Sequence, residues 1–283
     1  MDIKSGRSKI QLSPLQKYSC IEEWLIDLGL SKSWIKKKLA KKELQKKLPR
    51  IAEFSCDLLN KNMINPVYSG SPINIISQDD QYLVLEKPSG VHGHALEYSD
   101  KNNILSFIRS VGWGKLLSIN IEKAERGLLF RLDLETSGLL IYIKNQALFD
   151  ELFENRKILI TQKFYLAVVK GKTESQDKLT DYLLGSESKG AKMKIDPNGQ
   201  QANLSYKTLN YNKQKNYSLI EVCLETGLRH QIRIQLSHAG HPLLGDVKYG
   251  GEKADRLYLH AHKYCINLDH ELVFESEIPI SFF

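Results

Sequence analysis

Short segments in which apolar and polar residues alternate recur along most of this 283-residue chain. Such alternation is typical of β-strands that lay one face on a core. The segments that carry it are 82–90, 128–134, 139–143, 163–170, 202–209 and 217–225. Two segments with helical periodicity, 145–157 and 229–240, lie among them. Many short strands with few helices predict an α+β fold with a mixed, mostly antiparallel sheet rather than repeated βαβ units.

The excess positive charge of the chain lies in its first fifty residues. They contain 13 Lys and Arg against 5 Asp and Glu, whereas the whole chain carries +7. Residues 21–28 and 34–47 show helical spacing, with Lys36 and Lys37 on the polar face of the second helix. A basic surface of this kind favours a polyanion such as RNA, and it is equally typical of a solvated lysine face.

Two domains are expected, a small helical basic module at residues 1–62 and a main domain at residues 63–283. A linker rich in Asn, Pro, Gly and Ser, residues 60–72, lies at this boundary. No apolar run reaches the length of a membrane span, and the first residues lack the apolar block of a signal peptide. A cytoplasmic monomer without a membrane partner is therefore expected.

The four cysteines are scattered, and no two of them are spaced as C-x-x-C. They are Cys20, Cys56, Cys223 and Cys265. Reduced, mostly structural thiols are expected from this pattern, in keeping with a reducing compartment.

An arginine and two carboxylates interrupt one of the most apolar parts of the chain, residues 131–140, "RLDLETSGLL". If residues 128–134 form a strand, Arg131, Asp133 and Glu135 share one face of it. This polar row ends in a Thr-Ser-Gly turn. Taken alone, the pattern is more typical of a surface strand that ends in an Asp-assisted turn than of a reactive site.

Polar residues in two later segments allow both structural and functional interpretations. Tyr165 lies on a predicted strand, where tyrosine is usually part of the core with its hydroxyl hydrogen-bonded. Arg229 and Arg233 are four residues apart, which would place them on one face of a helix near its N-terminus. That end of a helix attracts anions, although solvated arginines are also common there.

Two histidine pairs suggest a different kind of site. His92 and His94, and likewise His260 and His262, would lie on one face of an extended segment, which is plausible geometry for a metal ion. Without a matching Cys or carboxylate motif, satisfied or exposed histidines are the better interpretation, and no metal is expected. A metal-dependent hydrolase remains as a rival hypothesis.

Four segments now stand in order along the chain: "LVLEKPSGVHGH", "FRLDLETSGLLI", "KFYLAVVKG" and "TGLRHQIRIQLSHAGHPLLGDVKYGG", followed by "LYLHAHKY". In this arrangement the chain resembles the RluA-type RNA pseudouridine synthases from about residue 73 to its end. The basic helix pair before them resembles, in degenerate form, the small RNA-binding module that precedes many RNA-modifying enzymes.

The resemblance implies roles for individual residues. Asp133 takes the position of the family's catalytic aspartate, and Arg131 that of the arginine that fills the gap left by the flipped uridine. Tyr165 matches the tyrosine that packs on the target base and is a candidate for proton removal. Arg233 matches the arginine that pairs with the catalytic carboxylate, and this pairing would keep the carboxylate charged in an apolar pocket.

The function implied is isomerisation of specific uridines in structured RNA, with ribosomal RNA favoured over transfer RNA. A non-catalytic RNA-binding relative is the alternative. Arg131, Arg229, Lys36 and Lys37 are expected to contact RNA. The reaction involves no redox change, and the sequence contains neither G-x-x-x-x-G-K nor G-x-G-x-x-G, so no cofactor is expected.

Overall fold

The computed structural model describes residues 9–12, 18–27, 32–47, 52–55, 64–95, 100–185, 192–279 and 282. The chain forms two compact units. The first unit contains residues 1–72, 91–128 and 143–149, and the second contains residues 73–90, 129–142 and 150–283. The expected domain boundary between residues 62 and 63 lies outside the described residues and stays a prediction.

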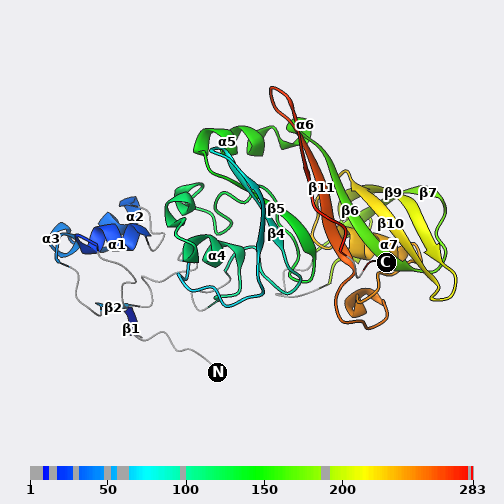
Figure 1. The fold of residues 1–283 in the computed structure, drawn as a ribbon, viewed down its shortest axis with the longest axis horizontal. Coiled ribbons are helices and arrows are strands. Elements are labelled where there is room, and N and C mark those ends of the chain that lie inside the picture. The colour runs from blue at the N-terminus through cyan, green and yellow to red at the C-terminus, as the bar shows by residue number, and fades with distance from the viewer. Residues whose placement is uncertain are drawn as a thin grey trace. The chain divides into compact units, whose positions relative to one another are not determined.

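The first unit contains a small sheet and several short helices, whose first elements are drawn in blue in Figure 1. Strand β1 (Lys9–Leu12) pairs antiparallel with β2 (Ala52–Ser55). The helices between these strands are α1 (Ile21–Asp27), α2 (Lys32–Lys38) and α3 (Lys41–Leu44), and later in the unit come α4 (Ile104–Ser110) and the 3-10 helix η2 (Gly114–Ser118). None of the helices in the described part of the chain is long and apolar enough to cross a membrane.

Two of the expected helices are interrupted. Residues 34–47 form parts of α2 and α3, because Ala40 between them has extended backbone angles, φ −68° and ψ 142°. Residues 145–157 form α5 (Gln146–Glu154) and α6 (Arg156–Leu159) on either side of Asn155. Apolar periodicity predicts the buried side of a helix, but it does not reveal a break one or two residues long.

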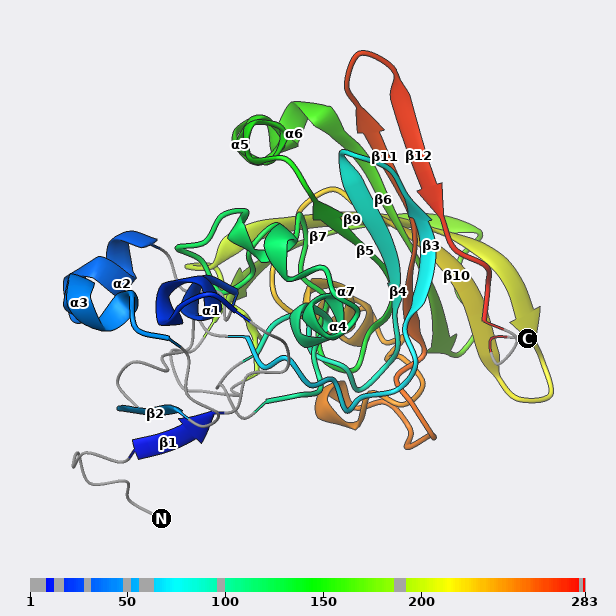
Figure 2. The ribbon, with the colours of Figure 1, turned by 60° about the vertical axis from the view of Figure 1, so that its left-hand side comes forward.

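The second unit carries a sheet of ten strands. In chain order they are β3 (Asn74–Gln78), β4 (Tyr82–Lys87), β5 (Ser137–Ile143), β6 (Ile160–Lys170), β7 (Gln176–Leu184), β8 (Lys194–Ile195), β9 (Gln200–Asn212), β10 (Tyr217–Leu224), β11 (Leu259–Asn267) and β12 (Glu271–Glu275). Their order in space is β3-β4-β5-β11-β6-β10-β9-β7-β8, with β12 beside β11 (Figures 1 and 2). β5 pairs parallel with β11, whereas β6 pairs antiparallel with both β10 and β11. The expected mixed, mostly antiparallel sheet is confirmed.

Strand β5 shows how the sheet fixes the segment that precedes it. All seven of its residues are buried, so the strand is held firmly in the interior. Gly138 has φ +114°, and a Cβ atom there would lie 2.2 Å from the carbonyl oxygen of Ala261 on β11. Only glycine permits this close approach of the two strands. The Thr-Ser-Gly sequence therefore anchors the start of β5, and with it the polar segment just before.

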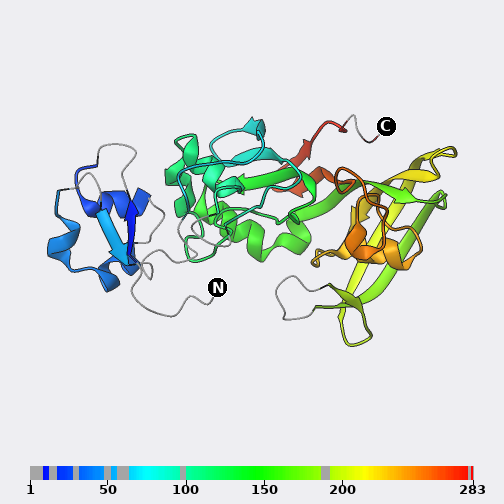
Figure 3. The ribbon, with the colours of Figure 1, turned by 90° about the horizontal axis from the view of Figure 1, so that it is seen from below.

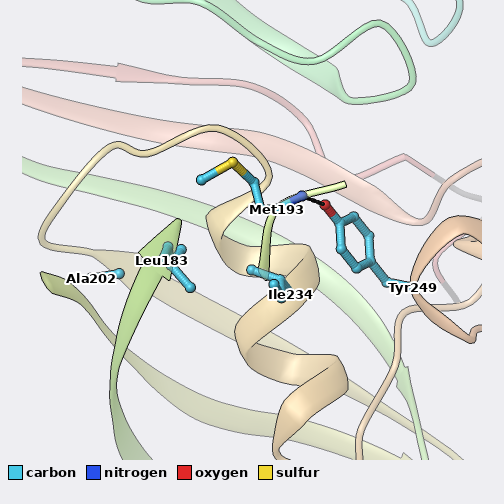
Figure 4. Packing of buried hydrophobic residues seen from close by; sticks show 5 residues of the cluster. All are labelled: Leu183, Met193, Ala202, Ile234 and Tyr249. Atoms are coloured by element: carbon cyan, nitrogen blue, oxygen red, sulfur yellow. Dashed lines mark hydrogen bonds between the residues drawn. The ribbon is translucent and has the colours of Figure 1, made fainter. Parts of the chain in front are cut away.

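Helix α7 (Gln231–His238) packs on the part of the sheet formed by β7 and β9 (Figure 3). Ile234 of α7 lies in one buried cluster with Leu183 of β7 and Ala202 of β9. Met193 and Tyr249 complete this cluster (Figure 4). The packing holds the helix, and the polar residues at its N-terminal end, in a fixed place against the sheet.

Candidate active site

The expected strand at residues 128–134 is wrong for most of its length. Residues 130–136 form an irregular segment that leads into β5, and the N–H of Thr136 donates to the carbonyl oxygen of Asp133 over 3.2 Å to close a turn. Asp133 and Glu135 thus lie on a loop next to the sheet rather than within a strand. Alternation of polar and apolar residues describes any extended backbone, and it does not require a neighbouring strand.

Residues at and just after the end of β4 bind this loop by hydrogen bonds, as a partner strand would. The buried ammonium group of Lys87 donates to the carbonyl oxygen of Leu134 over 3.1 Å, and the N–H of Gly90 donates to the same oxygen over 2.8 Å. The hydroxyl of Ser89 donates to the carbonyl oxygen of Glu135 over 2.7 Å. Because these three donors satisfy the loop carbonyls, the loop is fixed without ladder pairing.

Lys87 is fully buried, and this lowers its pKa to about 7 although the charges of Asp133 and Glu135 act in the opposite direction. Lys87 stands in the segment "LEKPSG", and no function is predicted for this lysine from the sequence. The sequence does contain one sign that Lys87 is unusual, because this lysine ends an apolar strand directly before a proline. A lysine in that place is more often solvated.

Arg233 lies on α7 with 3% of its side chain exposed, and it contacts three carboxylates. Its Nε and Nη2 donate to the two oxygens of Asp246 over 2.7 and 2.8 Å. Its remaining nitrogen, Nη1, donates to Glu135 over 3.1 Å and to Asp133 over 3.4 Å. The structure therefore brings Arg233 to Asp133 as predicted, but the two-pronged partner of the guanidinium is Asp246, whose side chain is fully buried.

This arrangement balances charge inside the protein. Burial disfavours the charged form of Arg233, yet the hydrogen bonds and charges of Asp246, followed by the charges of Asp133 and Glu135, raise its pKa. Burial would raise the pKa of Glu135, but its own backbone N–H and the charge of Arg233 lower it. A buried guanidinium with several carboxylate partners stays charged, and its charge favours the ionised form of Glu135.

His230 is a further residue of the site and was not predicted from the sequence, although it lies between Arg229 and Arg233 in the chain. Its Nε2 is 3.9 Å from Oδ2 of Asp133, and its Nδ1 is 2.8 Å from the hydroxyl oxygen of Tyr249. The residue has φ +53°, in the left-handed region that few residues other than glycine adopt. Burial lowers the pKa of His230, against the pull of the Asp133 charge.

Tyr165 lies on β6, buried with 7% of its surface exposed. Its hydroxyl is 3.3 Å from the hydroxyl of Tyr264, and the two rings meet edge to face. The ring of Phe130 stacks on Tyr264 at a centroid distance of 4.7 Å. Burial raises the pKa of Tyr165 to about 12, and the negative charge of Asp133 adds to the rise. The phenol is therefore protonated at neutral pH, in the electrostatic environment of Asp133.

The residues predicted to bind RNA are exposed. Arg131 lies on the loop beside Asp133, and Arg229 lies two residues before α7 begins. The expectation that Arg229 and Arg233 share one helix face is therefore wrong, because the left-handed backbone at His230 separates Arg229 from the helix. Lys36 and Lys37 are exposed on α2 in the first unit.

The histidine pairs do not form a metal centre in the described residues. Nδ1 of His260 is 2.8 Å from the hydroxyl of Ser137, and its Nε2 is 2.8 Å from the hydroxyl of Ser276, so both ring nitrogens are engaged. His262 contacts Glu275 over 3.2 Å. Within the described ranges, no three His, Cys, Asp or Glu side chains are grouped as metal ligands are. The pair on β11 is thus a structural element of the sheet.

Comparisons with known proteins point to one enzyme family. A family model described as RNA pseudouridylate synthase matches residues 81–238. An uncharacterized RNA pseudouridine synthase of Helicobacter pylori is 32% identical over 91% of this chain and 90% of its own length. Ribosomal large subunit pseudouridine synthase D of Borreliella burgdorferi is 32% identical over 76% of this chain and 68% of its own length.

Two further comparisons concern coverage and fold. The uncharacterized RNA pseudouridine synthase YhcT of Bacillus subtilis is 30% identical over 68% of this chain, and the match spans 63% of that protein. The solved structure of human RNA pseudouridylate synthase domain containing 1 superposes with a TM-score of 0.61 at 22% identity, covering 75% of this chain and 87% of that one. At this identity the structural likeness concerns the fold.

Proposed function

Because this chain belongs to the RNA pseudouridylate synthase family, of the RluA type, and is an isomerase that acts on RNA, we propose that it converts specific uridines of large-subunit ribosomal RNA to pseudouridine. In this proposal Asp133 is the catalytic carboxylate, Tyr165 packs on the target base, and Arg233 is the partner of Asp133. Relatives named as ribosomal large subunit synthases support the choice of RNA.

One observation carries the assignment of Asp133. Its side chain is 23% exposed, and it contacts the guanidinium of Arg233, which is 3% exposed and fixed by Asp246. A carboxylate held in this way has a charged hydrogen-bonding partner and is still accessible to a molecule that enters from solvent. Glu135 contacts the same guanidinium, but its side chain is 47% exposed and therefore more of it faces solvent.

The chemistry needs one ionised carboxylate beside the ribose. Forming pseudouridine breaks the N-glycosidic bond, turns the uracil and joins the base to the sugar again through carbon. Asp133 either attacks the sugar carbon or takes a sugar proton as the base departs, and both routes begin from its charged form. The target uridine must first leave its stack, which costs a few kcal/mol.

In this proposal the extruded base stacks on the ring of Tyr165, which is 7% exposed before RNA binds. Stacking of a base on an aromatic ring is worth about 1–3 kcal/mol, enough to offset much of that cost. With a pKa of about 12, the hydroxyl is a hydrogen-bond donor at neutral pH. Removal of the base proton by Tyr165 therefore requires that the phenol first passes its own proton to a neighbouring group, at an expense of about 7 kcal/mol at neutral pH.

The exposed cations supply phosphate attraction in this proposal. Arg131 and Arg229 flank the Asp133 loop and α7, and Lys36 and Lys37 extend the basic surface of the first unit. Contacts of this kind release counterions, so they weaken steeply as salt rises.

Replacing Lys36 and Lys37 by Gln should reduce RNA affinity and flatten its salt dependence while kcat is kept. An unchanged salt dependence would remove these two lysines from the RNA contacts.

The proposed target is tested by mapping pseudouridines in the RNA of cells with and without this protein. We expect one or a few sites in large-subunit ribosomal RNA to be lost and to return when the wild-type chain is supplied, but not with Asp133→Asn. Loss confined to transfer RNA would overturn the ribosomal target and keep the activity. An unchanged map of all RNA would overturn the activity itself.

A further inference from the structure

His230 lies at the N-terminal end of α7, in a turn that is closed by side-chain hydrogen bonds of Gln231. The side-chain oxygen of Gln231 accepts the N–H of Leu228 over 3.1 Å and the hydroxyl of Thr226 over 2.8 Å. These bonds hold the turn while His230 takes its left-handed conformation with φ +53°. A non-glycine residue held in this region is strained, and such strain persists where the surroundings over-determine it.

Tyr249 faces one ring nitrogen of His230. Its hydroxyl oxygen accepts the backbone N–H of Met193 over 2.9 Å, an interaction drawn in Figure 4. The same hydroxyl is 2.8 Å from Nδ1 of His230. Since the oxygen already accepts one N–H, the hydroxyl is best satisfied when it donates its single proton to Nδ1.

This contact sets the tautomer of the imidazole. A neutral ring whose Nδ1 accepts a hydrogen bond carries its proton on Nε2. Nε2 is the nitrogen that faces Asp133, 3.9 Å from Oδ2. That separation is about 1 Å longer than a hydrogen bond, and catalytic hydrogen bonds are often long until substrate binds.

Both donors near Asp133 approach the same oxygen. Nη1 of Arg233 is 3.4 Å from Oδ2, and Nε2 of His230 is 3.9 Å from it. The guanidinium of Arg233 also lies over the ring of Tyr249, with its Cζ 5.5 Å from the ring centroid. One tyrosine therefore contacts both donors. Donors gathered on Oδ2 orient the carboxylate, and neither of these two contacts uses Oδ1.

We propose that His230 is a positioning residue for Asp133, held by Tyr249 as the tautomer with its proton on Nε2, so that Oδ2 is anchored and Oδ1 is presented to the ribose. The part that concerns the ribose rests on the proposed function of Asp133. The tautomer itself does not, and it can be measured without substrate. Burial, which lowers the pKa of His230, keeps the ring neutral as this arrangement requires.

The first test is spectroscopic and uses the full chain labelled with ¹⁵N at histidine. Long-range proton–nitrogen spectra distinguish a protonated from an unprotonated ring nitrogen, and the signals missing from His230→Gln identify residue 230. At pH 7.5 we expect a protonated Nε2 and an unprotonated Nδ1. In Tyr249→Phe the preference should weaken. Tyr211→Phe, a control at a partly exposed tyrosine whose hydroxyl donates to Asn216 on the neighbouring turn, should leave it unchanged. A proton on Nδ1 of His230 would overturn the proposal, as would a doubly protonated ring.

The second test separates positioning from a structural role. The side-chain amide nitrogen of Gln can reach the place of Nε2, whereas that of Asn reaches only the place of Nδ1. A purely structural role predicts the reverse ranking, because Asn tolerates a left-handed backbone better than Gln. We therefore expect His230→Gln to keep more kcat than His230→Asn, with KM for RNA within about twofold in both.

Tyr249→Phe keeps the ring beside Arg233 and removes only the hydroxyl. A misdirected carboxylate can cost about 10- to 100-fold in rate. We expect a fall of that order in kcat, again with KM for RNA little changed. If His230→Asn outperforms His230→Gln, or if Tyr249→Phe keeps full kcat, the positioning role is overturned. Activity that survives in Asp133→Asn would instead overturn the proposed function and leave the tautomer result standing.

Discussion

Two polar clusters in the second unit each contain a histidine, and they differ in how their hydrogen bonds are completed. In the closed cluster, formed by Ser137, His260 and Ser276, the imidazole is 1% exposed and has a hydroxyl partner at each nitrogen. In the open cluster, formed by Asp133, Glu135, His230 and Arg233, the donors converge on carboxylates that remain partly exposed.

This difference in hydrogen bonding indicates a structural role for the closed cluster and a role at the candidate active site for the open cluster. Burial lowers the pKa of His260 to about 3, so this ring is neutral near pH 7. Its two hydrogen bonds join β5 to the residue that follows β12. In the open cluster Arg233 keeps its charge, because the buried Asp246 hydrogen-bonds to two of its nitrogens. Saturated polar networks fix a fold, whereas converging donors around an accessible carboxylate leave capacity for a substrate.

The largest effect in this comparison is expected at Tyr165. Tyr165→Phe keeps the aromatic face and loses the hydroxyl, so a role in proton transfer predicts a fall of about 10²- to 10⁴-fold in product formation. Tyr165→Ala should in addition lose about 1–3 kcal/mol of base stacking. Single-turnover assays of glycosidic cleavage and of pseudouridine would separate the two steps. Near-normal product from Tyr165→Phe would reduce this residue to a platform.

A second prediction concerns the buried pair that supports the open cluster. Asp246→Asn removes the fully buried carboxylate that Arg233 binds through two hydrogen bonds, and leaves it only the partly exposed Glu135 and Asp133. Breaking a buried ion pair costs about 3–5 kcal/mol of unfolding free energy. Replacing both residues, as Arg233→Met with Asp246→Leu, should restore much of that stability without restoring turnover. Urea unfolding and turnover per folded molecule are the two measurements. Full turnover in the double variant would show that neither residue serves the reaction.

The closed cluster should respond in the opposite way. His260→Phe fills the space but leaves the hydroxyls of Ser137 and Ser276 without the imidazole, at about 2 kcal/mol or more of unfolding free energy. Because His260 serves the sheet and not the site, kcat per folded molecule should stay within about twofold of wild type. A loss of kcat at unchanged stability would erase the distinction between the clusters.

The smallest effect is a pH dependence at Lys87. Its pKa falls from an ordinary 10.5 to about 7 in the folded protein, so above pH 7 the unfolded chain binds the proton that the folded chain has lost. Stability should therefore rise with pH in wild type relative to Lys87→Met, by about 2 kcal/mol between pH 6.5 and 8.5. Urea unfolding of both proteins at the two pH values measures it. Parallel pH profiles would mean that Lys87 stays charged in the fold.

Sequence reasoning captured the features that repeat along the chain. Alternating segments revealed the mixed sheet, and the motif around Asp133 led to Arg233 and Tyr165, which the structure places in the same unit. It misread residues 128–134 as a strand, since alternation cannot show that Lys87 and Ser89 take the place of a partner strand. It also missed the pairing of β1 with β2, whose partners lie about forty residues apart.

The rest of the site depends on contacts between distant segments. Asp246 and Tyr249 stand in the quoted motif "GDVKYGG", but nothing local shows that one meets Arg233 and the other His230. The left-handed backbone of His230 is equally hidden, because a histidine does not mark it as a glycine would. Such features follow from packing, and a single sequence carries little signal for them.

The most direct test of the account is a purified, folded Asp133→Asn protein assayed for pseudouridine in its mapped target RNA. Asparagine keeps the size of the side chain but lacks the charge and basicity that the reaction needs. The matched control is Asp269→Asn, in the exposed turn between β11 and β12, which should behave as wild type. We predict that Asp133→Asn binds the RNA as well as wild type or better and forms no pseudouridine above background. Substantial isomerisation by this variant would contradict the central claim that Asp133 is the catalytic carboxylate.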